Sequence, residues 1–463
     1  MSIWPPTKGD LARPAYRSLA RALSEAISSG RFRPGDRLPP HRELAFELGV
    51  SVQTVSRAYE ELARLGLLTG EVGRGSFVRT ETLQEARVPW HRLARSEAVI
   101  DCSMLAPVTG DLHAHRFAAA LVSLAEAPPP EVMFSFRPRA TLEAHCDAVR
   151  PWLRRLGVDV SRDRILPTNG STAAMSVALM TAAAPGDLIL TEEMGHHTLK
   201  PLTASLGLRV QGLEMDAEGI RPEAFESACA AGPVAALFVM PNGLGATGAR
   251  MGEDRRREIA EIARRNNVWI IENDAWGPLA EERCEPIASI APERTFHITG
   301  LSKCLLPGLR VGWLTSPDKM VSAARTRHLV THWMATPLLA EIAARWIADG
   351  TAVELLAWQR AALERRNSIA AHAFTGLPHV LHRHGLHVWL PLPDAWDEDD
   401  FVAHARHEGV AVAAGARFAI GAPQRHQGVR VCLGSGSESE LAEGLAVLGR
   451  LARSEPEPAL LAL

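Results

Sequence analysis

A lysine at position 303 lies in a segment suited to carbonyl chemistry. Residues 299–310 read Thr-Gly-Leu-Ser-Lys-Cys-Leu-Leu-Pro-Gly-Leu-Arg and follow an apolar run that predicts a strand. The amine of a lysine can form a Schiff base with an aldehyde. An arginine can hold a phosphate through a fork of parallel hydrogen bonds. Lys303 and Arg310, seven residues apart, are therefore candidates for binding an aldehyde and a phosphate.

Three other segments carry groups that suit charged ligands. Residues 167–175 lead from an expected strand into an expected helix through small residues. A helix start favours an anion, although many helices begin this way for capping alone. Residues 271–274 place two carboxylates and an amide at the end of an apolar strand, where open sheets bind ligands. Arg430, within the strand-like run 428–433, suits either the capture of a carboxylate or a structural salt bridge.

A regular alternation of strands and helices is expected to position these four segments. Apolar runs predict strands at residues 188–190, 236–240, 268–272, 294–298 and 311–314. Helical patterns lie between them, at residues 171–184 and 254–265. This alternation is typical of an α/β domain built on a mostly parallel sheet.

The first 79 residues predict a separate unit of a different kind. The patterns indicate three helices and a pair of short strands, in chain order at residues 14–29, 41–48, 52–65 and 67–78. The second and third helices are joined by a tight turn at Gly49, and Ser51 is the expected N-cap of the third. This is the helix-turn-helix pattern, and the strand pair around its Gly-rich turn predicts a wing.

Charge is distributed unevenly along the chain. The formal net charge is −3, but residues 1–79 hold twelve Lys and Arg against eight Asp and Glu. The head thus carries +4 and the remainder −7, as expected if only the head meets nucleic acid phosphate. Residues 80–96 show no clear period, and we predict that they form a linker.

Composition narrows the class of protein further. A chain of 463 residues predicts two or three domains, and its six cysteines lack the short spacings of a zinc site, so no metal is expected. No apolar stretch reaches the roughly 18 residues needed to span a membrane. The N-terminus does not resemble a signal peptide, and we expect a cytoplasmic protein without membrane contact.

Four short motifs run through the N-terminal unit. They are Pro-Gly-Asp-Arg-Leu-Pro at 34–39, Arg-Glu-Leu-Ala at 42–45, Gly-Leu-Leu at 66–68 and Gly-Arg-Gly-Ser-Phe-Val at 73–78. In this order they resemble the GntR family of bacterial winged-helix regulators. The resemblance implies that the third helix enters the major groove of operator DNA, with further contacts to phosphate or the minor groove. The implied DNA-binding residues are Arg42, Ser51, Gln53, Thr54, Arg57 and Arg74.

The predicted recognition helix departs from the family at two positions. Many members carry arginine where this chain has Val52 and Ser56, so Arg57 is displaced by one position. Gln53 suits adenine, and Arg57 suits guanine or phosphate. We therefore expect a different base preference. The alternative for Arg57 and its neighbours is that they are only solvated surface charges.

The four segments of the body resemble the fold-type I enzymes that use pyridoxal 5'-phosphate (PLP). Behind a GntR head they are similar to the MocR (GabR-like) subfamily, in which an aminotransferase-like domain has become a sensor. The resemblance implies a mostly parallel sheet with helices on both faces and a smaller C-terminal α+β subdomain. The expected domains are a DNA-binding head, a linker and a PLP-binding effector and dimerisation domain, at residues 1–79, 80–96 and 97–463.

The resemblance also assigns roles, position by position. Lys303 would form the Schiff base with PLP, Asp274 would pair with the pyridine nitrogen, and Arg310 would bind the phosphate. A carboxylate beside that nitrogen favours its protonated form and deepens the electron sink. Arg430 would bind the carboxylate of the effector. The other implied cofactor-binding residues are Ser171, Thr172, His196, Ser302, Trp276 and Asn242.

Four positions around the expected cofactor depart from the family pattern. Gly245 stands where an asparagine usually donates to the phenolic oxygen, and Asn242 is near enough in sequence to replace it. Trp276 and His196 replace tyrosines, and His196 can both stack and titrate. Gly300 replaces a residue that often carries a hydroxyl. These departures favour a sensor over a competent enzyme.

The sequence thus predicts a one-component transcription regulator. It would sense an amino acid or amine as an external aldimine at Lys303 and act as a homodimer, because the PLP site of fold-type I proteins is built at the subunit interface. One alternative is an active aminotransferase with a regulatory head. Another is a body that has lost PLP and serves only as a dimerisation scaffold.

Overall fold

The computed structural model describes residues 15–28, 31–32, 35–64, 67–71, 75–78, 99–134, 139–243, 245–280, 282–421 and 427–455. The chain divides into two compact units, Met1–Ala94 and Arg95–Leu463. The linker predicted at 80–96 lies outside the described residues. None of the helices in the described stretches has the length and apolar composition needed to cross a membrane.

The N-terminal unit is a winged helix-turn-helix, as predicted. Its described elements are α1 (Ala15–Ser28), α2 (His41–Leu48), α3 (Val52–Arg64), β1 (Leu68–Glu71) and the antiparallel β2 (Gly75–Val78). Gly49 ends α2 at a φ of 61°, and Ser51 caps α3 because its Oγ accepts a 3.2 Å hydrogen bond from the Thr54 N–H. The core gathers apolar side chains from all three helices, including Leu19, Leu23, Leu44, Leu48, Val55 and Leu62.

The C-terminal unit is built on a seven-stranded sheet in the order β4-β12-β11-β10-β9-β5-β6. Only β12 runs antiparallel to its neighbours, so the mostly parallel sheet that the sequence predicts is confirmed. The strands are β4 (Ile165–Thr168), β5 (Leu188–Glu192), β6 (Arg209–Leu213), β9 (Ala236–Val239), β10 (Trp269–Asn273), β11 (Thr295–Gly300) and β12 (Gly312–Thr315).

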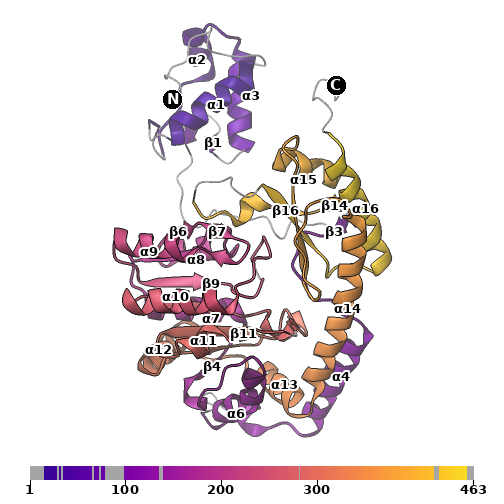
Figure 1. Cartoon of the computed structure of the whole chain (residues 1–463). Helices are drawn as coiled ribbons and strands as arrows, with labels where there is room; N and C mark the ends of the chain where they lie inside the picture. The colour runs from indigo at the N-terminus through magenta and orange to yellow at the C-terminus, as the bar shows by residue number, and fades with distance from the viewer. Residues whose placement is uncertain are drawn as a thin grey trace. The chain divides into compact units, whose positions relative to one another are not determined.

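Successive side chains of each strand point to opposite faces of the sheet and so belong to two separate hydrophobic cores. Ile271 and Phe238 point to the face covered by α7 (Ser171–Ala182), whereas Ile270 and Leu237 point to the opposite face. That second face is covered by α9 (Pro222–Ala231), α10 (Glu253–Arg265) and α11 (Ile287–Ile290). Figure 1 labels these helices around the strands of the sheet. The alternation fixes which residues at the strand ends meet α7.

Further helices pack on the face of the sheet that α7 covers and along the edges of the sheet. They are α4 (Asp111–Glu126), α5 (Pro130–Met133), α6 (Arg139–Arg155), α8 (Leu199–Ser205), α12 (Val321–His332) and α13 (Pro337–Ala348). Short pairs of strands are formed by β3 (Ile100–Asp101) with β14 (Val410–Ala411) and by β7 (Met215–Asp216) with β8 (Gly219–Ile220).

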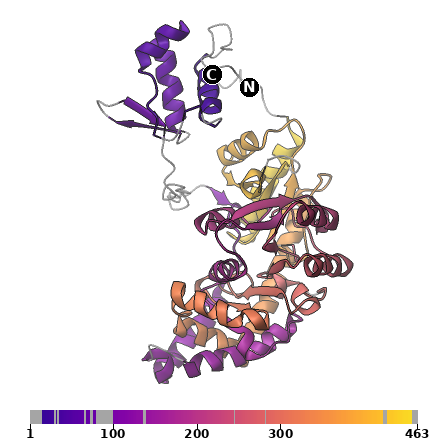
Figure 2. The same ribbon diagram turned by 90° about the vertical axis from the view of Figure 1, so that its left-hand side faces the viewer.

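A smaller C-terminal subdomain packs at one end of this unit. It contains an antiparallel sheet in the order β13-β16-β15 and two helices, with bounds β13 (His387–Pro391), β15 (Ala413–Ala414), β16 (Gly428–Cys432), α15 (Glu398–His407) and α16 (Glu438–Arg453). The long helix α14 (Thr351–Ala373) runs from α4 to α16 and so joins the two parts (Figure 1). The turned view in Figure 2 shows the yellow C-terminal elements gathered at that end.

Candidate functional site

A cavity of the C-terminal unit lies at the carboxyl ends of the central strands. Its lining comes from segments that are far apart in sequence, which are Leu105, Ser171, Thr172, Met175, Gly195, His196, His197, Thr198, Ala246, Asn273, Ala275, Ser302, Lys303, Arg310, Phe418 and Arg430. Three of these side chains are cationic and none is a carboxylate among the described residues. The cavity is therefore suited to an anionic ligand.

Lys303 enters the cavity from the turn that follows β11. Its Nζ donates a 2.5 Å hydrogen bond to the Leu105 carbonyl. Burial, and after it the positive charge of Arg430, lower the pKa of Lys303 to about 8, with a smaller contribution from Arg310. A larger fraction of the amine is then uncharged near neutral pH than in an exposed lysine. An uncharged amine is the form that attacks an aldehyde.

The start of α7 and the loop after Lys303 form one end of the cavity. A Cβ added at Gly170, whose φ is +80°, would lie 3.0 Å from Nη2 of Arg310, so glycine lets the guanidinium lie against the backbone. Ser302 has a buried Oγ without a hydrogen-bond partner among the described residues. Together with Ser171 and Thr172 at the helix start, these groups can hold a phosphate.

Gly300 has a packing role that explains its lack of a side chain. A Cβ there would lie 3.0 Å from the Val311 carbonyl oxygen and 3.1 Å from Oγ of Ser171. Gly245 differs, since its nearest neighbours would be 3.8 Å away. The loss of a hydroxyl at Gly300 therefore follows from close packing. The loss of an amide at Gly245 does not.

Arg430, on β16, is another cationic side chain that lines the cavity. The side chain is buried, its Nη2 donates to the Ser103 carbonyl at 3.2 Å, and its guanidinium lies 4.4 Å from the centre of the Phe418 ring. Its buried Nε has no hydrogen-bond partner in the described part of the chain. An arginine held in this way has donors left to capture a carboxylate.

Two adjacent histidines form one wall of the cavity. The rings of His196 and His197 stack with centroids 4.6 Å apart, and Nδ1 of His196 is 2.8 Å from Oγ1 of Thr198. Burial is the first cause that lowers the pKa of His196 well below its usual value, and nearby positive charges add to it. The ring is thus uncharged at neutral pH and offers a stacking surface. The sequence analysis expected that His196 could also titrate, but the lowered pKa places that titration below neutral pH.

Asp274 is not brought into the cavity. Its carboxylate lies 2.6 Å from Nη2 of Arg283 and 3.3 Å from Nε2 of His297, and it accepts a 2.5 Å hydrogen bond from Asn242. Burial would raise the pKa of Asp274, but the charge of Arg283 and the contact with His297 outweigh it and lower the pKa to about 2. This carboxylate is fully engaged on the other side of the strand end.

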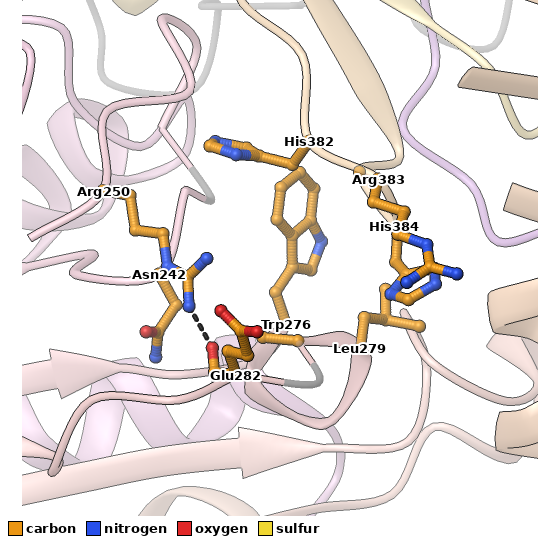
Figure 3. A pocket seen from close by; sticks show the side chains of 10 residues that line it. Asn242, Arg250, Trp276, Leu279, Glu282, His382, Arg383 and His384 are labelled. Carbon is orange, nitrogen blue, oxygen red and sulfur yellow. Dashed lines mark hydrogen bonds between the residues drawn. The ribbon is translucent and has the colours of Figure 1, made fainter. Parts of the chain in front are cut away.

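Asn242 and Trp276 likewise line a different hollow, which Figure 3 shows from close by. Both ends of the Asn242 amide are used, because its Oδ1 accepts a 2.7 Å hydrogen bond from Arg256. The Trp276 indole stands in the middle of this hollow, with Arg250 on one side and His384 on the other. Neither residue lines the cavity that contains Lys303.

The sequence analysis singled out residues 271–274 but gave the role in cofactor binding to Asp274, whereas Asn273 and Ala275, on either side of it in sequence, line the cavity. The signal was present in the strand alternation. Ile271 faces α7, so Asn273, two residues later on β10, faces α7 as well. The cavity thus contains Lys303, Arg310, Ser171, Thr172, Ser302, His196 and Arg430, and excludes Asp274, Asn242 and Trp276.

The N-terminal unit presents the residues expected to contact DNA at the start of α3. Ser51, Gln53 and Arg57 are exposed, as is Arg42 on α2. Thr54 is partly buried, and its Oγ1 lies 2.9 Å from Oγ of Ser51. The Arg57 guanidinium lies 5.8 Å from the centre of the Tyr16 ring. Arg74 lies outside the described residues.

Comparisons with known proteins identify both units. A family model described as aminotransferase class I and II matches residues 132–448, and one described as bacterial regulatory proteins, gntR family, matches residues 15–78. YdeF of Bacillus subtilis, named as an uncharacterized HTH-type transcriptional regulator, is 29% identical over 455 residues, which are 97% of this chain and 96% of the relative. These matches confirm both resemblances drawn from the sequence.

Two further relatives extend the comparison. MocR of Rhizobium meliloti, a probable rhizopine catabolism regulatory protein, is 24% identical over 84% of this chain and 80% of its own length. The structure of LysN, an α-aminoadipate aminotransferase of Thermus thermophilus solved with N-(5'-phosphopyridoxyl)-L-leucine, matches 77% of this chain and 92% of its own. Its TM-score is 0.69 at 19% identity, which shows a common fold.

Proposed function

Because this chain belongs to the aminotransferase class I and II family and carries a gntR-family head, we propose that it is a PLP-dependent transcription regulator. Its head binds operator DNA, and its body senses an amino acid or amine. The observation that carries this proposal is the lining of the cavity, which combines Lys303 with two arginines, Arg310 and Arg430, and no carboxylate among the described residues.

The residues of the cavity fit PLP. When bound, PLP supplies an aldehyde that links amines covalently and a ring that withdraws electrons from them. Lys303 would hold the aldehyde carbon, and the Oγ of Ser302, the start of α7 and Arg310 would hold the phosphate. His196 provides a ring face against which an aromatic cofactor can stack.

The effector is expected to carry a carboxylate or another acidic group beside its amine. Arg430 lines the cavity, and its buried Nε has no hydrogen-bond partner among the residues that the structure describes. A buried guanidinium without an anionic partner is costly, so binding of a carboxylate there is favourable. An amine without an acid group would leave this donor unused.

The recognition surface for DNA is the exposed start of α3. Gln53 and Arg57 can reach base edges in the major groove, while Arg42 and Arg74 contact phosphate or the minor groove. Capping by Ser51 fixes the first turn of α3, so these side chains are presented from an ordered helix end. We place this activity in the cytoplasm, where operator DNA is found.

We also propose a homodimer. Thr172 and Arg310 are exposed in the single chain although both belong to the expected phosphate end. A phosphate held there would stay open to water unless a second copy covered it. Two heads in one dimer would then meet two half-sites of an operator.

An active aminotransferase with a regulatory head is the second candidate. It is supported by the cavity, which retains the lysine and both arginines of a substrate site. The changes at Gly245 and His196 count against it, because they remove groups that the family uses around the ring.

The deciding experiment uses the full-length protein. After PLP is added and the complex is reduced with borohydride, peptide mapping should find the label on Lys303. Operator fragments are then selected from random DNA duplexes and titrated with and without a panel of amino acids and amines. A compound that changes the absorption of the bound cofactor should also change the affinity for the operator. By linkage, the operator should change the affinity for that compound by the same factor.

Three outcomes would contradict the proposal. They are a label elsewhere than Lys303, no selected operator, and ligands that change the absorption without affecting DNA binding. Steady production of a 2-oxo acid from the same ligands, with operator affinity unchanged, would favour the aminotransferase. The control is Lys303→Ala, which should keep DNA binding and lose the response.

A further inference from the structure

We propose that Asn273, in place of a carboxylate, meets the ring nitrogen of the cofactor and presents an N–H donor to it. This inference rests on the proposed function, since it requires PLP in the cavity. Its consequence is a cofactor whose ring nitrogen carries no proton. Such a cofactor still binds amines but draws electrons from them weakly, which suits a sensor.

The geometry of β10 determines which residue meets the ligand. Asn273 is the last residue of the strand and shares a face with Ile271, toward α7 and the cavity. The next residue, Asp274, faces away, and Ala275 again lines the cavity. Because successive side chains alternate, one strand end cannot present both Asn273 and Asp274 to the same ligand.

Asp274 is held in place on its own side. It is paired with Arg283 at 2.6 Å and bonded to Asn242 at 2.5 Å, and it is almost fully buried. Gly277 makes room for this arrangement, because a Cβ there would lie 2.2 Å from both the Asp274 carboxylate and the Arg283 guanidinium. Moving Asp274 toward the cavity would leave the half-buried Arg283 without its carboxylate partner.

The Asn273 amide has a defined orientation. Its Oδ1 accepts a hydrogen bond from the Ala275 N–H at 3.3 Å, so the amide oxygen is occupied by the backbone. Its Nδ2 lies 4.0 Å from Sδ of Met175, a weak acceptor, and the side chain is only 1% exposed. A buried N–H is therefore available to an acceptor in the cavity. An unprotonated pyridine nitrogen is an acceptor, whereas a protonated one is a second donor.

The other polar groups of the cavity already have fitting roles. Lys303 takes the aldehyde, the Ser302 and Arg310 end takes the phosphate, and Arg430 takes the carboxylate of the ligand. No described carboxylate lines the cavity to stabilise an additional positive charge. A protonated ring nitrogen would therefore be buried there without a carboxylate beside it, which disfavours its charged form.

The test measures the ring nitrogen directly. Full-length protein is loaded with PLP that is ¹⁵N-labelled in the ring, and the ¹⁵N chemical shift is recorded by NMR. The wild type should show the shift of an unprotonated pyridine between pH 6 and about 8, near the neutral range where PLP proteins work. Asn273→Asp should move the shift to that of a pyridinium. A pyridinium shift in the wild type would overturn the inference.

Two further variants keep the test decisive if Asn273→Asp does not fold. Asn273→Ala removes the donor, and it should weaken PLP binding about three- to tenfold while the nitrogen stays unprotonated. Asp274→Asn tests the competing assignment, and it should lower thermal stability without changing the ¹⁵N shift. A shift that follows Asp274 and not Asn273 would refute the proposal.

Failure of the proposed function would look different. If borohydride leaves no cofactor on Lys303 in the wild type, the chain does not use PLP and the proposed function is lost. If the label is on Lys303 but the ring nitrogen is protonated, only the role of Asn273 is lost. The two measurements are made on the same sample.

Discussion

The two units build their candidate sites in opposite ways. In the head, Ser51, Gln53 and Arg57 lie within two turns of one helix, and their exposure follows from the helical period. In the body, the cavity collects side chains from segments between Leu105 and Arg430. A site on one helix can be read from local pattern, whereas a site at the end of a sheet depends on which way each strand residue faces.

This difference determines how a single substitution affects ligand binding in each unit. The head is expected to contact operator DNA through several side chains, so removal of one contact should weaken DNA binding only partially. Lys303 is the one amine among the described residues that line the cavity, so its removal should abolish covalent binding entirely. Substitutions in the two units should therefore have effects of different kinds, and the predictions below run from the largest to the smallest.

Lys303→Ala should abolish covalent binding of PLP, because a lysine amine is needed to form the bond. Operator binding without effector should remain within about twofold of wild type, since the head folds around its own core. Borohydride trapping and a DNA titration measure the two quantities. Parallel loss of both would show that the separation between the units is wrong.

Arg57→Ala should weaken operator binding by about 1 to 3 kcal/mol per half-site and leave the PLP absorption unchanged. The matched control is Arg257→Ala, which removes an exposed arginine of α10 whose partner is Glu285 at 3.0 Å. The control should bind operator like wild type. Equal affinities for wild type and Arg57→Ala would place recognition elsewhere on the head.

Gly300→Ser and Gly245→Ser compare the same substitution at two buried glycines of the cavity region. The added Cβ at Gly300 meets backbone at 3.0 Å, so this variant should lose about 1 to 3 kcal/mol of unfolding free energy through overpacking. At Gly245 the nearest atoms are 3.8 Å away, and the loss should be much smaller. Thermal unfolding of both variants checks this, and equal losses would contradict the packing explanation.

Sequence reasoning predicted the elements of both units because their apolar periods are long and regular. The resemblance to fold-type I PLP enzymes also implied that Lys303, Arg310, Ser302 and Arg430 share one site, and all four line the cavity. Sequence reasoning did not predict that Asp274 turns away, because the pattern alone does not show which face of the strand meets α7; in the structure Asp274 pairs with Arg283 on the other side. From the sequence, Asn273 and Asp274 are equally good candidates for contacting the cofactor. The choice between them requires knowing which face of the strand lines the cavity.

The smallest effect concerns the pH dependence of PLP capture. Burial and Arg430 lower the pKa of Lys303 to about 8, so the reactive uncharged amine gains population as pH rises and dominates above that value. Capture by wild type should therefore be half-maximal near pH 8 and level off above it. Arg430→Gln removes a positive charge, which makes protonation of Lys303 easier and raises its pKa. The half-maximal point should then move to higher pH.

Arg430→Lys is the matched control for this shift. It keeps the charge, so the pH profile should stay close to that of wild type, but it loses the fork that grips a carboxylate, so amino acid ligands should bind more weakly. The rate of capture is measured by borohydride trapping at a series of pH values, and the ionisation of free PLP is common to all three proteins. A profile of Arg430→Gln that coincides with wild type would mean that burial alone sets the reactivity of Lys303.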